Sequence, residues 1–481
     1  MSLLLLLLVL PLAASATAYF PLGRRLPPAV TLIACVGELG LSVAAATMIS
    51  SSVRIVAVPN WLELDGFSAL VLVLVALVST TGALFSWGYM AREADDGHLR
   101  RYYVNYNFFV WSMLAVPMLV EPALVWTAAE LTTILGVYLV AFDNTHESVE
   151  AAWKYSILTI MGGAVALLGF IVLHSATRYG EAPFTWTGLV ALAPHVPAKI
   201  LRTAFLLILF GFGAKVGLVP LHTWLPDTHS QAPSPVCALL SGVKTTVVLY
   251  VILRMIPVLE ASGAIDPSRW TVPVGLVSVG VAAFLILQVS DYKRLFAYST
   301  VEHMGIILTA AGLGSTAACY GAVFQILTHA LTKSFCFFAA GMTLLAVETR
   351  SIASVRGLLQ TAPATAIALL VGAIAIAGAP PLVVFLSEFS VLRAAVFGKH
   401  YVAVALLALF IAVAFFGMLY HVSRMVFGDA GTTESPQCVA RPPLSCVLTV
   451  ILSAAPVILL GFYLPAPLDT LLKMAAQSLS R

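Results

Sequence analysis

Seven ionisable residues stand inside otherwise apolar stretches of this sequence, and they are the residues best placed to do chemistry. They are Glu130, Lys215, Lys244, His303, His329, Lys333 and Glu388. A charged side chain at the centre of a bilayer costs at least about 2.5–3.5 kcal/mol, so such residues are rarely kept without a use. Lysine, histidine and glutamate all exchange protons. The set therefore predicts a proton pathway, with no catalytic residue and no metal ligand.

A buried lysine and a carboxylate can act together as a proton switch. Desolvation favours the neutral amine, and a nearby carboxylate favours the ammonium. A change in the distance between the lysine and the carboxylate therefore makes the lysine bind or release a proton. At an effective dielectric of about 20, a pair 4 Å apart is worth about 4 kcal/mol. Moving one charge against 100 mV costs about 2.3 kcal/mol. Such a switch is therefore strong enough to drive the step.

Each of these residues also has a purely structural interpretation. A lysine near the end of a span can extend its amine to the interface, which suits Lys154 better than the deeper Lys215 and Lys333. A histidine such as His329 can simply bond a neighbouring carbonyl. Glu302 is expected to pair locally with a loop cation. His329 and Lys333, four residues apart, share one face of a helix.

The composition indicates where these residues lie. Of 481 residues, 60% are hydrophobic and only 10% are charged, against roughly 25% charged in typical globular chains. That charge cannot cover a water-facing exterior, so the exterior must be lipid. The net charge of +3 is too small to indicate nucleic acid as a partner. We expect a multi-pass protein of the cell (inner) membrane.

The cysteines do not indicate a redox or metal centre. There are six of them, without a CxxC pair or a Cys/His cluster of zinc or iron–sulfur spacing: Cys35, Cys237, Cys319, Cys336, Cys438 and Cys446. Glycine-rich phosphate loops are absent as well. We therefore expect no cofactor on this chain and interpret the cysteines as small core residues.

The elements that must position the ionisable residues are membrane helices, each needing about 20 apolar residues. The sequence predicts an all-α membrane protein of about fourteen transmembrane helices. They fall near residues 2–19, 28–50, 66–90, 104–120, 122–142, 154–174, 200–221, 234–256, 271–288, 295–314, 318–347, 363–397, 402–425 and 443–464. The first is interpreted as a membrane helix rather than a signal peptide, because it lacks a basic start.

Two of these helices are broken by proline at matching positions. The seventh runs into Pro220, and the twelfth contains Pro380 and Pro381. At membrane depth such a break needs protein or a water-filled cavity around it. Each broken helix is the fourth of five, in residues 104–256 and 271–425, and an odd number of helices turns the second set upside down. This pattern indicates two inverted five-helix repeats, although two unrelated kinks would also explain it.

These boundaries divide the chain into four parts. Residues 1–103 hold helices one to three, residues 104–256 the first five-helix repeat, and residues 271–425 the inverted second repeat. Residues 426–481 hold the C-terminal transmembrane helix.

Three sequence blocks carry a family resemblance. Residues 215–233 read KVGLVPLHTWLPDTHSQAP, residues 291–305 read DYKRLFAYSTVEHMG, and residues 329–333 read HALTK. They resemble motifs of the antiporter-like membrane subunits of respiratory complex I, of the related membrane-bound group 4 hydrogenases and of the multisubunit sodium/proton antiporters. The resemblance extends over about residues 65–425.

The resemblance implies roles for the ionisable residues. Glu130 resembles the glutamate that pairs with the broken-helix lysine, here Lys215. Lys333 and His329 resemble a central relay, and His303 lies next to it.

Of two further positions, one agrees with the family motifs and the other departs from them. Glu388 resembles the terminal glutamate of M-type subunits. Lys244 departs from many relatives, whose lysine stands about two residues later, where this chain has Thr246. On an α-helix that offset is about 200°, so Lys244 is expected to face another way.

Residues 231–242, QAPSPVCALLSG, are most similar to the F-type subunit of hydrogenase-4 and formate hydrogenlyase-like complexes. The resemblance implies a non-catalytic, proton-translocating membrane subunit of a multisubunit oxidoreductase complex of the hydrogenase or NADH dehydrogenase type. Its expected partners are other membrane and peripheral subunits, the lipid bilayer, and protons or sodium ions.

Four alternatives remain open at this point. The chain could be an M-type subunit of complex I (NADH–quinone oxidoreductase) or a cation/proton antiporter subunit. It could also be a quinone-binding oxidoreductase, or a structural subunit whose pump has decayed.

Overall fold

The apolar runs of the sequence form helices, because a chain in lipid must satisfy its backbone hydrogen bonds within itself. The computed structural model describes residues 3–21, 23–51, 54–428 and 441–480. Cys438 lies outside these residues. Within them the chain is helical apart from connecting segments and one short hairpin, so the expected all-α class is confirmed.

The helices follow one another along the chain in three groups. The N-terminal group is α1 (Leu3–Tyr19), α2 (Leu26–Ser51) and α3 (Gly66–Tyr89). The next group is α4 (Asp96–Met118), α5 (Pro122–Val140), α6 (His146–His174), α7 (Trp186–Leu192), α8 (Ala198–Val216), α9 (Trp224–Gln231), α10 (Ser234–Leu239), α11 (Thr245–Leu253) and α12 (Met255–Ala261). The last is α13 (Ser268–Ile286), α14 (Tyr292–Gly312), α15 (Thr316–Val347), α16 (Leu358–Thr361), α17 (Pro363–Ile376), α18 (Val383–Phe397), α19 (Tyr401–Phe427), α20 (Leu444–Phe462) and α21 (Ala466–Gln477).

Nine helical segments of the described chain are long and apolar enough to cross a membrane, and α1 and α17 are shorter apolar helices. The protein is therefore a multi-pass membrane protein, as predicted. Each predicted span coincides with helical structure, and the differences lie at the ends. Helices α4 and α6 begin before the predicted residues because Asp95 and Thr145 cap them, accepting from the N–H groups of Gly97 and Ser148.

Both predicted helix breaks are present. Helix α8 ends at Gly217, whose φ of 87° only glycine adopts readily, and the N–H groups of Gly217 and Leu218 both return to the Gly213 carbonyl. Helix α17 ends in the same manner before Gly378, whose φ is 75°. The chain resumes as α9 and α18. The two breaks place polar backbone inside the bundle, next to the buried ionisable side chains.

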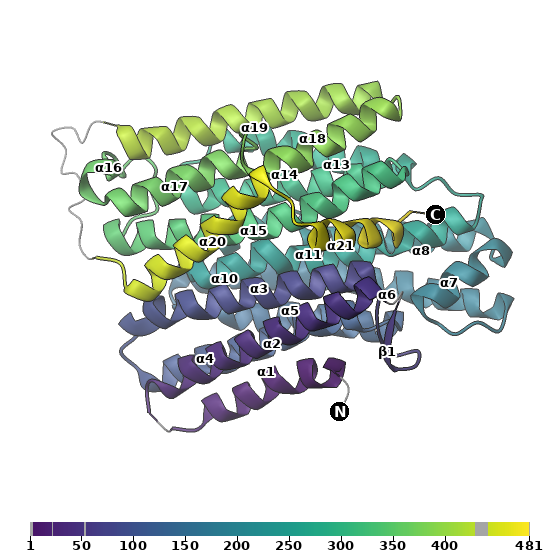
Figure 1. Ribbon diagram of the computed structural model, residues 1–481, viewed down its shortest axis with the longest axis horizontal. Coiled ribbons are helices and arrows are strands. Elements are labelled where there is room, and N and C mark those ends of the chain that lie inside the picture. The colour runs from purple at the N-terminus through teal and green to yellow at the C-terminus, as the bar shows by residue number, and fades with distance from the viewer. Residues whose placement is uncertain (1–2, 22, 52–53, 429–440, 481) are drawn as a thin grey trace.

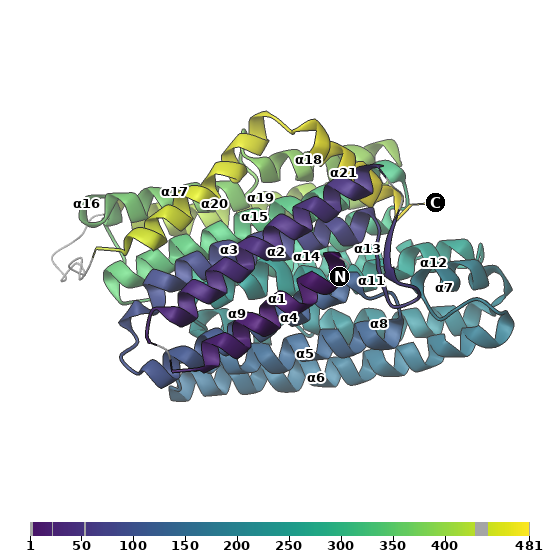
Figure 2. The same cartoon turned by 60° about the horizontal axis from the view of Figure 1, so that its bottom comes forward.

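The helices lie side by side and form one bundle (Figure 1). The long helix α15 runs through the middle of the bundle and packs against α3, α14, α17, α18 and α20. Helices α5 and α6 form one edge of the bundle in the turned view of Figure 2, and α19 forms the upper edge in Figure 1. The helices of the first predicted repeat contact those of the second mainly where α9 and α10 pack against α14 and α15.

Two elements were not predicted from the sequence. Strands β1 (Ile55–Val58) and β2 (Leu62–Leu64) pair in an antiparallel hairpin between α2 and α3. Helix α21 is amphipathic and buries Leu472 and Ala475 against α3 and α15. It approaches so closely that a Cβ atom at Gly66 would lie 2.8 Å from Met474. Both elements lie at the same end of the bundle.

Candidate functional site

Glu130 of α5 and Lys215 of α8 form a buried ion pair. Lys215 Nζ lies 3.0 Å from Glu130 Oε2 and donates to Thr133 Oγ1 at 2.7 Å. The lysine side chain is fully buried and the glutamate side chain is 13% exposed. Because the pair is shielded from water, removing one partner would leave the other as an uncompensated buried charge.

The local sequence makes room for this pair. Gly163 of α6 faces Glu130, and a Cβ atom there would overlap the carboxylate. The indole N–H of Trp126 donates to the Gly163 carbonyl at 2.9 Å and holds α5 against α6. Lys215 stands in the last turn of α8, where unpaired carbonyls carry partial negative charge and favour an ammonium group.

Lys244 also faces this pair. Its Nζ donates to the Lys215 carbonyl at 3.2 Å. It lies 5.0 Å from the ring centroid of Tyr155 and 4.9 Å from that of Trp224. Trp224 is fixed by a 2.7 Å hydrogen bond from its indole N–H to the Ala214 carbonyl. The two aromatic faces provide a favourable site for a cation beside a second lysine.

The direction of Lys244 follows from an irregular helical turn. Residues Leu240–Lys244 form a π-helical turn between α10 and α11, which accommodates an extra residue and re-aims the side chains around it. Lys244 is the last residue of this turn, and from there its amine reaches the Lys215 carbonyl. The hydroxyl of Thr246 donates to the Gly242 carbonyl at 3.1 Å, within its own helix.

Lys333 of α15 has contacts of a different kind. Its Nζ donates to the Phe296 carbonyl at 2.5 Å and to Ser299 Oγ, both on α14. The side chain is fully buried. Within the described part of the chain, no carboxylate lies within ion-pair distance of it. This lysine is therefore held by neutral oxygen atoms.

Two histidines lie next to Lys333. His329 is one turn earlier on α15, and its ring centroid lies 5.3 Å from that of His303 on α14. His329 Nε2 lies 3.1 Å from the Ser241 carbonyl, and His303 Nε2 lies 3.1 Å from the Ile376 carbonyl. Since a carbonyl only accepts, both Nε2 atoms donate and both Nδ1 atoms are acceptors in the neutral rings.

A chain of neutral side chains continues from His303 to the second helix break. The Gln325 amide donates to His303 Nδ1 at 3.0 Å. Ser387 donates to Gln325 Oε1 at 2.5 Å and lies 2.8 Å from the hydroxyl of Thr328. Ser387 precedes Glu388 on α18. The hydrogen-bonded network thus ends at Ser387, the residue before the predicted terminal glutamate.

Two carboxyl groups lie at this end of the network. Glu302 is 4% and Glu388 is 5% exposed, and Glu302 interacts electrostatically with Glu388 and with Lys333. The expectation that Glu302 pairs with a loop cation is wrong, because the described residues contain no such ion pair and the side chain is buried. A Cβ atom at Gly378 would overlap the Glu388 carboxylate.

The π-helical turn connects the two groups of residues. Ser241 lies within it, and its hydroxyl is 2.6 Å from that of Thr300 on α14. The Ser241 carbonyl accepts from His329, and the turn ends at Lys244. One turn of helix therefore contacts the lysine of the first group and the histidine of the second.

The structure places all seven predicted residues inside the bundle, on helices from α5 to α18. Lys154, interpreted as a surface lysine, is 45% exposed and pairs with Glu150 at 2.9 Å and Asp227 at 3.0 Å. The sequence reasoning missed the neutral partners Thr133, Ser299, Gln325 and Ser387. The sequence could have indicated these partners only where a polar residue shares a helix face with an ionisable one. That indication is weak, because serine and threonine hydroxyls often bond a carbonyl of their own helix instead.

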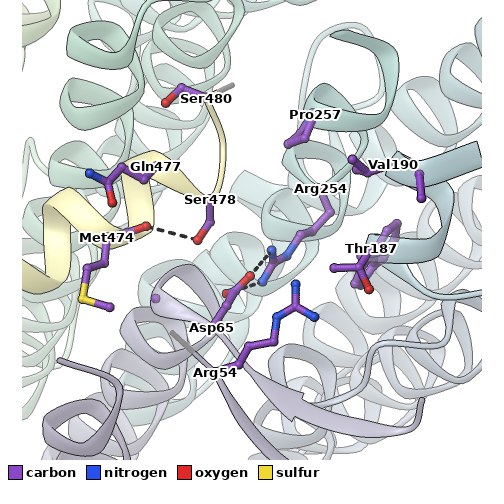
Figure 3. Close-up of a pocket in the computed structure, with 13 residues that line it drawn as sticks. Arg54, Asp65, Thr187, Val190, Arg254, Pro257, Met474, Gln477, Ser478 and Ser480 are labelled. Carbon is purple, nitrogen blue, oxygen red and sulfur yellow. Dashed lines mark hydrogen bonds and ion pairs between the residues drawn. The ribbon is translucent and has the colours of Figure 1, made fainter. Parts of the chain in front are cut away.

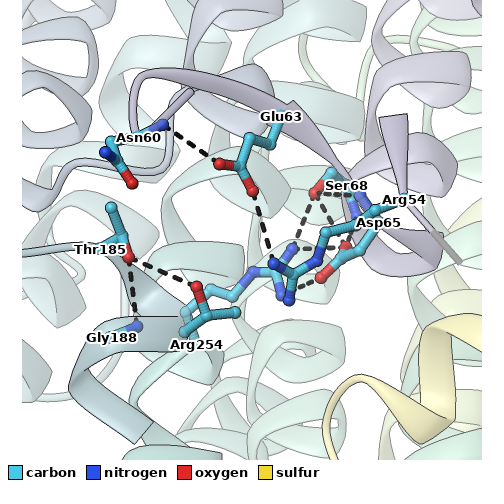
Figure 4. A network of polar contacts seen from close by, with 9 residues as sticks. Arg54, Asn60, Glu63, Asp65, Ser68, Thr185, Gly188 and Arg254 are labelled. Atoms are coloured by element: carbon cyan, nitrogen blue, oxygen red, sulfur yellow. Dashed lines mark hydrogen bonds and ion pairs between the residues drawn. The ribbon is translucent and has the colours of Figure 1, made fainter. Parts of the chain in front are cut away.

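A surface pocket of about 540 Å³ lies apart from this path (Figure 3). Arg54, Asp65 and Arg254 line it together with residues of α7 and α21. Arg254 donates to both Asp65 oxygens at 2.5 and 2.6 Å (Figure 4). Burial alone would raise the pKa of Asp65, but the Arg254 guanidinium and Ser68 outweigh it and hold the pKa at about 2. This pair fastens the start of α3 to the end of α11.

Fold and site together define a polytopic membrane protein whose interior carries two groups of buried protonatable side chains. Within the described residues, no group of three or more His, Cys, Asp and Glu side chains could hold a metal ion.

The chain belongs to the NADH:quinone oxidoreductase/Mrp antiporter family. The transmembrane model of that family matches residues 122–428, and a model of the N-terminus of NADH-ubiquinone oxidoreductase (complex I) chain 5 matches residues 51–103.

Three relatives illustrate the range of this family. A hydrogenase-4 component F homolog of Methylacidiphilum infernorum is 37% identical over 77% of this chain and 80% of its own length. Hydrogenase-4 component B of Escherichia coli is 30% identical over 68% of this chain and 50% of its own length, so this chain matches half of that protein. NADH-quinone oxidoreductase subunit M of Escherichia coli is 27% identical over 85% of this chain and 80% of its own length.

Two solved structures share the fold. A chain of the membrane-bound sulfane sulfur reductase, an archaeal respiratory membrane complex, superposes with a TM-score of 0.89 at 24% identity, over 99% of this chain and 97% of that one. A chain of the Mrp complex of Dietzia superposes with a TM-score of 0.87 at 19% identity, over 99% and 97% of the two chains.

Proposed function

We propose that this chain is the proton-translocating membrane subunit of a multisubunit redox complex of the hydrogenase-4 type. The observation that carries the proposal is the buried Glu130–Lys215 pair, at 3.0 Å, at one end of an interior series of protonatable groups. The similarity to hydrogenase-4 component F over most of both chains supports the choice of complex. Redox centres and their cofactors then belong to partner subunits.

The proposed step begins at the ion pair. At 3.0 Å and an effective dielectric of about 20, the attraction between Lys215 and Glu130 is about 5 kcal/mol. Separating the two groups favours release of the lysine proton, and the Lys244 amine is the adjacent acceptor when it is neutral. The attraction exceeds the cost of about 2.3 kcal/mol for moving one charge against 100 mV, so the pair can drive the transfer.

The proton then continues into the second group of residues. We infer a path from Lys244 past Ser241 to His329, Lys333 and His303, and from there to Glu388. The Nδ1 atom of His329 is buried and has no partner among the described residues, so it is free to accept. Ordered water would bridge the remaining gaps, as buried water does between unsatisfied polar groups.

The division into two inverted five-helix repeats is part of this proposal. In each predicted repeat the broken helix ends at a glycine with positive φ, Gly217 or Gly378. Lys215 lies just before the first break and Glu388 lies after the second. Broken helices at corresponding positions are a common site of ion binding in transporters built from inverted repeats.

The test is proton translocation by the assembled complex in reconstituted vesicles. Lys215→Ala and Glu130→Gln are each expected to abolish proton uptake while the complex keeps its subunits. Lys199→Ala is the matched control, because Lys199 is an exposed lysine on the same helix α8. Normal pumping by Lys215→Ala would overturn the proposal.

The alternative functions differ in their partners. As an M-type subunit of complex I, the chain would copurify with NADH-oxidising subunits. As a cation/proton antiporter subunit, it would copurify with other antiporter subunits and translocate protons only against a sodium gradient. The similarity to NADH-quinone oxidoreductase subunit M supports the first alternative, and the similarity in fold to a chain of the Mrp complex supports the second. Mass spectrometry of the complex purified through a tag on this chain decides between them.

A further inference from the structure

Helix α2 carries a buried carboxyl group that the path described above does not use. The Glu38 side chain is fully buried. Neither of its two oxygen atoms has a partner that meets hydrogen-bond geometry among the described residues, and the thiol of Cys35, one turn earlier on α2, is a weak donor beside it. The sequence reasoning passed over it, although a glutamate in the middle of an apolar span is the same signal that singled out Glu130. A carboxyl group in this position requires an explanation, since buried polar groups are almost always hydrogen-bonded.

Glu38 belongs to a polar stripe along α2. Thr31, Cys35, Glu38 and Ser42 are spaced four, three and four residues apart, so they share one helix face. All four side chains are fully buried. An apolar helix that only packed against its neighbours would not need a carboxyl group and two hydroxyls on the face it buries.

The facing helices present polar groups to this stripe. The Asn107 amide of α4 donates to Thr31 Oγ1 at 2.8 Å. Thr80 of α3 donates to the Cys35 carbonyl at 2.9 Å. These two hydrogen bonds set the positions along α2 at which α3 and α4 pack against it.

Tyr106 completes the interface around Glu38. Its hydroxyl donates to the Ser79 carbonyl at 2.7 Å, and it interacts electrostatically with Cys35 and Glu38. Glu38 thus lies at the junction of three helices.

Several polar atoms along this junction have no partner. Besides the two Glu38 oxygens, they are Ser42 Oγ, Ser79 Oγ and Asn107 Oδ1, all buried. They come from α2, α3 and α4, which pack against one another. A buried water molecule typically makes about three hydrogen bonds to such groups. Ordered water in this junction would therefore bond to these atoms of Glu38, Ser42, Ser79 and Asn107.

The elements around α2 bring no cation to Glu38. Helices α1 and α3 and strand β1 contain no charged residue. Lys473 of α21 is 63% exposed and pairs with Asp469 at 2.6 Å. The charged residues of α4 stand in its first two turns: Asp96, His98, Arg100 and Arg101. An ionised carboxylate with no cation and only a weak thiol donor beside it is very costly to bury, so these surroundings favour the neutral acid.

We propose that Glu38 is a second proton-binding site, outside the path from Glu130 to Glu388. It holds its proton as a carboxylic acid and exchanges it through ordered water bonded to Ser42, Ser79 and Asn107. On release the acid O–H bond breaks and the proton passes to the adjacent water, leaving the carboxylate, and uptake is the reverse. The site requires neither a redox partner nor the function proposed above, because it follows from α2, α3 and α4 alone.

The test is infrared spectroscopy of the complete complex in vesicles at neutral pH. The difference spectrum between wild type and Glu38→Gln is expected to contain the C=O stretch of a protonated carboxyl group. In heavy water this band is expected to shift, because water reaches the acid proton. A difference spectrum with only carboxylate bands, or a band that never shifts in heavy water, would contradict the proposal.

Two further variants keep the test decisive. Ser79→Ala removes one of the unpartnered hydroxyls and is expected to slow the shift in heavy water several-fold, with the band retained. Glu147→Gln is the control, because Glu147 is an exposed glutamate on α6, and it should leave the band unchanged. If Glu38→Gln does not assemble, carbodiimide labelling of the wild type, which modifies protonated carboxyls, must mark Glu38.

Sodium is the competing ligand for these oxygen atoms. If added sodium chloride at constant pH abolished the protonated band, and potassium chloride did not, the site would bind a metal cation and the proposal would be wrong. Retention of the band in sodium is the expected result.

Discussion

The two groups of buried residues hold their lysines in different ways. Lys215 contacts a carboxylate at 3.0 Å, whereas Lys333 contacts a carbonyl and a hydroxyl. The second group contains two carboxyl groups, Glu302 and Glu388, but neither forms an ion pair among the described residues. The charge of the first lysine is thus balanced by contact, and that of the second depends on a network of neutral groups.

This difference indicates what each group of residues contributes to the proposed proton transfer. An ion pair changes strongly with the distance between its two members, so the first group responds to small movements of α5 against α8. The second lysine, held by neutral oxygen atoms, depends less on any one distance. We therefore propose that the energy-dependent step belongs to Glu130 and Lys215, and that the residues around Lys333 pass the proton on.

The largest expected effect comes from replacing each lysine by arginine. Arginine does not release its proton in proteins, so Lys215→Arg and Lys333→Arg should both abolish proton translocation in vesicles. Their effects on stability should differ. Lys215→Arg keeps a cation beside Glu130, whereas the larger planar group at position 333 has no carboxylate to pair with.

Thermal unfolding of the purified complex measures that difference. Lys215→Arg is expected to unfold near the wild-type temperature and Lys333→Arg well below it. Lys199→Arg, at an exposed position of α8, is the control for both measurements. Equal destabilisation by the two variants would remove the proposed distinction between the groups.

A smaller effect is expected from two glycines that face carboxylates. Gly163→Ala pushes the Glu130 carboxylate away from Lys215, and should slow translocation by about tenfold, the equivalent of about 1.4 kcal/mol. Gly378→Ala displaces Glu388 and also places a side chain at a φ of 75°, so it should additionally lower the unfolding temperature.

Gly213→Ala is the control for both glycine variants, because a Cβ atom there meets its nearest neighbour at an ordinary 3.5 Å. Translocation rates and unfolding temperatures are measured on the same preparations. A Gly163→Ala complex that pumps at the wild-type rate would show that the distance between Glu130 and Lys215 is not critical.

The smallest effect on transport is expected at the ion pair of Asp65 and Arg254, which lines the surface pocket. It is also a carboxylate–cation pair but lies outside the proposed path, so Asp65→Asn should leave translocation unchanged and lower stability by about 2–3 kcal/mol. The pKa of Asp65 is about 2 in the folded chain and about 3.9 unfolded. Its contribution is therefore fully present above about pH 5 and is lost as the pH falls toward 2.

Thermal unfolding of wild type and Asp65→Asn between pH 8 and pH 3 checks this. The difference between the two proteins should be constant from pH 8 to pH 5 and should shrink below that. A difference that grew on acidification would contradict the assigned direction of the pKa shift, and a loss of translocation would extend the functional path to this end of the bundle.

Much of the site could be predicted from single residues. Glu130, Lys215 and Lys333 were identified because a charged residue in an apolar span is costly wherever it finally points. The two breaks at Pro220 and Pro380 were identified because proline interrupts a helix regardless of its neighbours. These are local properties, and the structure has helix breaks where they indicated them.

Other features depended on contacts between helices. Thr133 and Ser299 could not be selected from the many hydroxyls of the chain, since only the packing of α5 on α8 and of α14 on α15 makes them partners of lysines. Glu302 was expected to pair with a loop cation, but it lies on α14 with its side chain buried in the core. The contacts of Lys244 also depended on packing, because only the approach of its helix to α8 brings its amine to the Lys215 carbonyl.

By itself, the sequence determined the membrane location, the helical class and which helices carry ionisable groups. Each of these follows from the free energy of transferring a segment from water to lipid, which depends on composition alone. Only the tertiary structure decided that Lys215 meets a carboxylate and Lys333 does not, and that Glu38 lies buried without a cation at the junction of three helices. Those distinctions depend on which helix faces pack together, and no single segment contains that information.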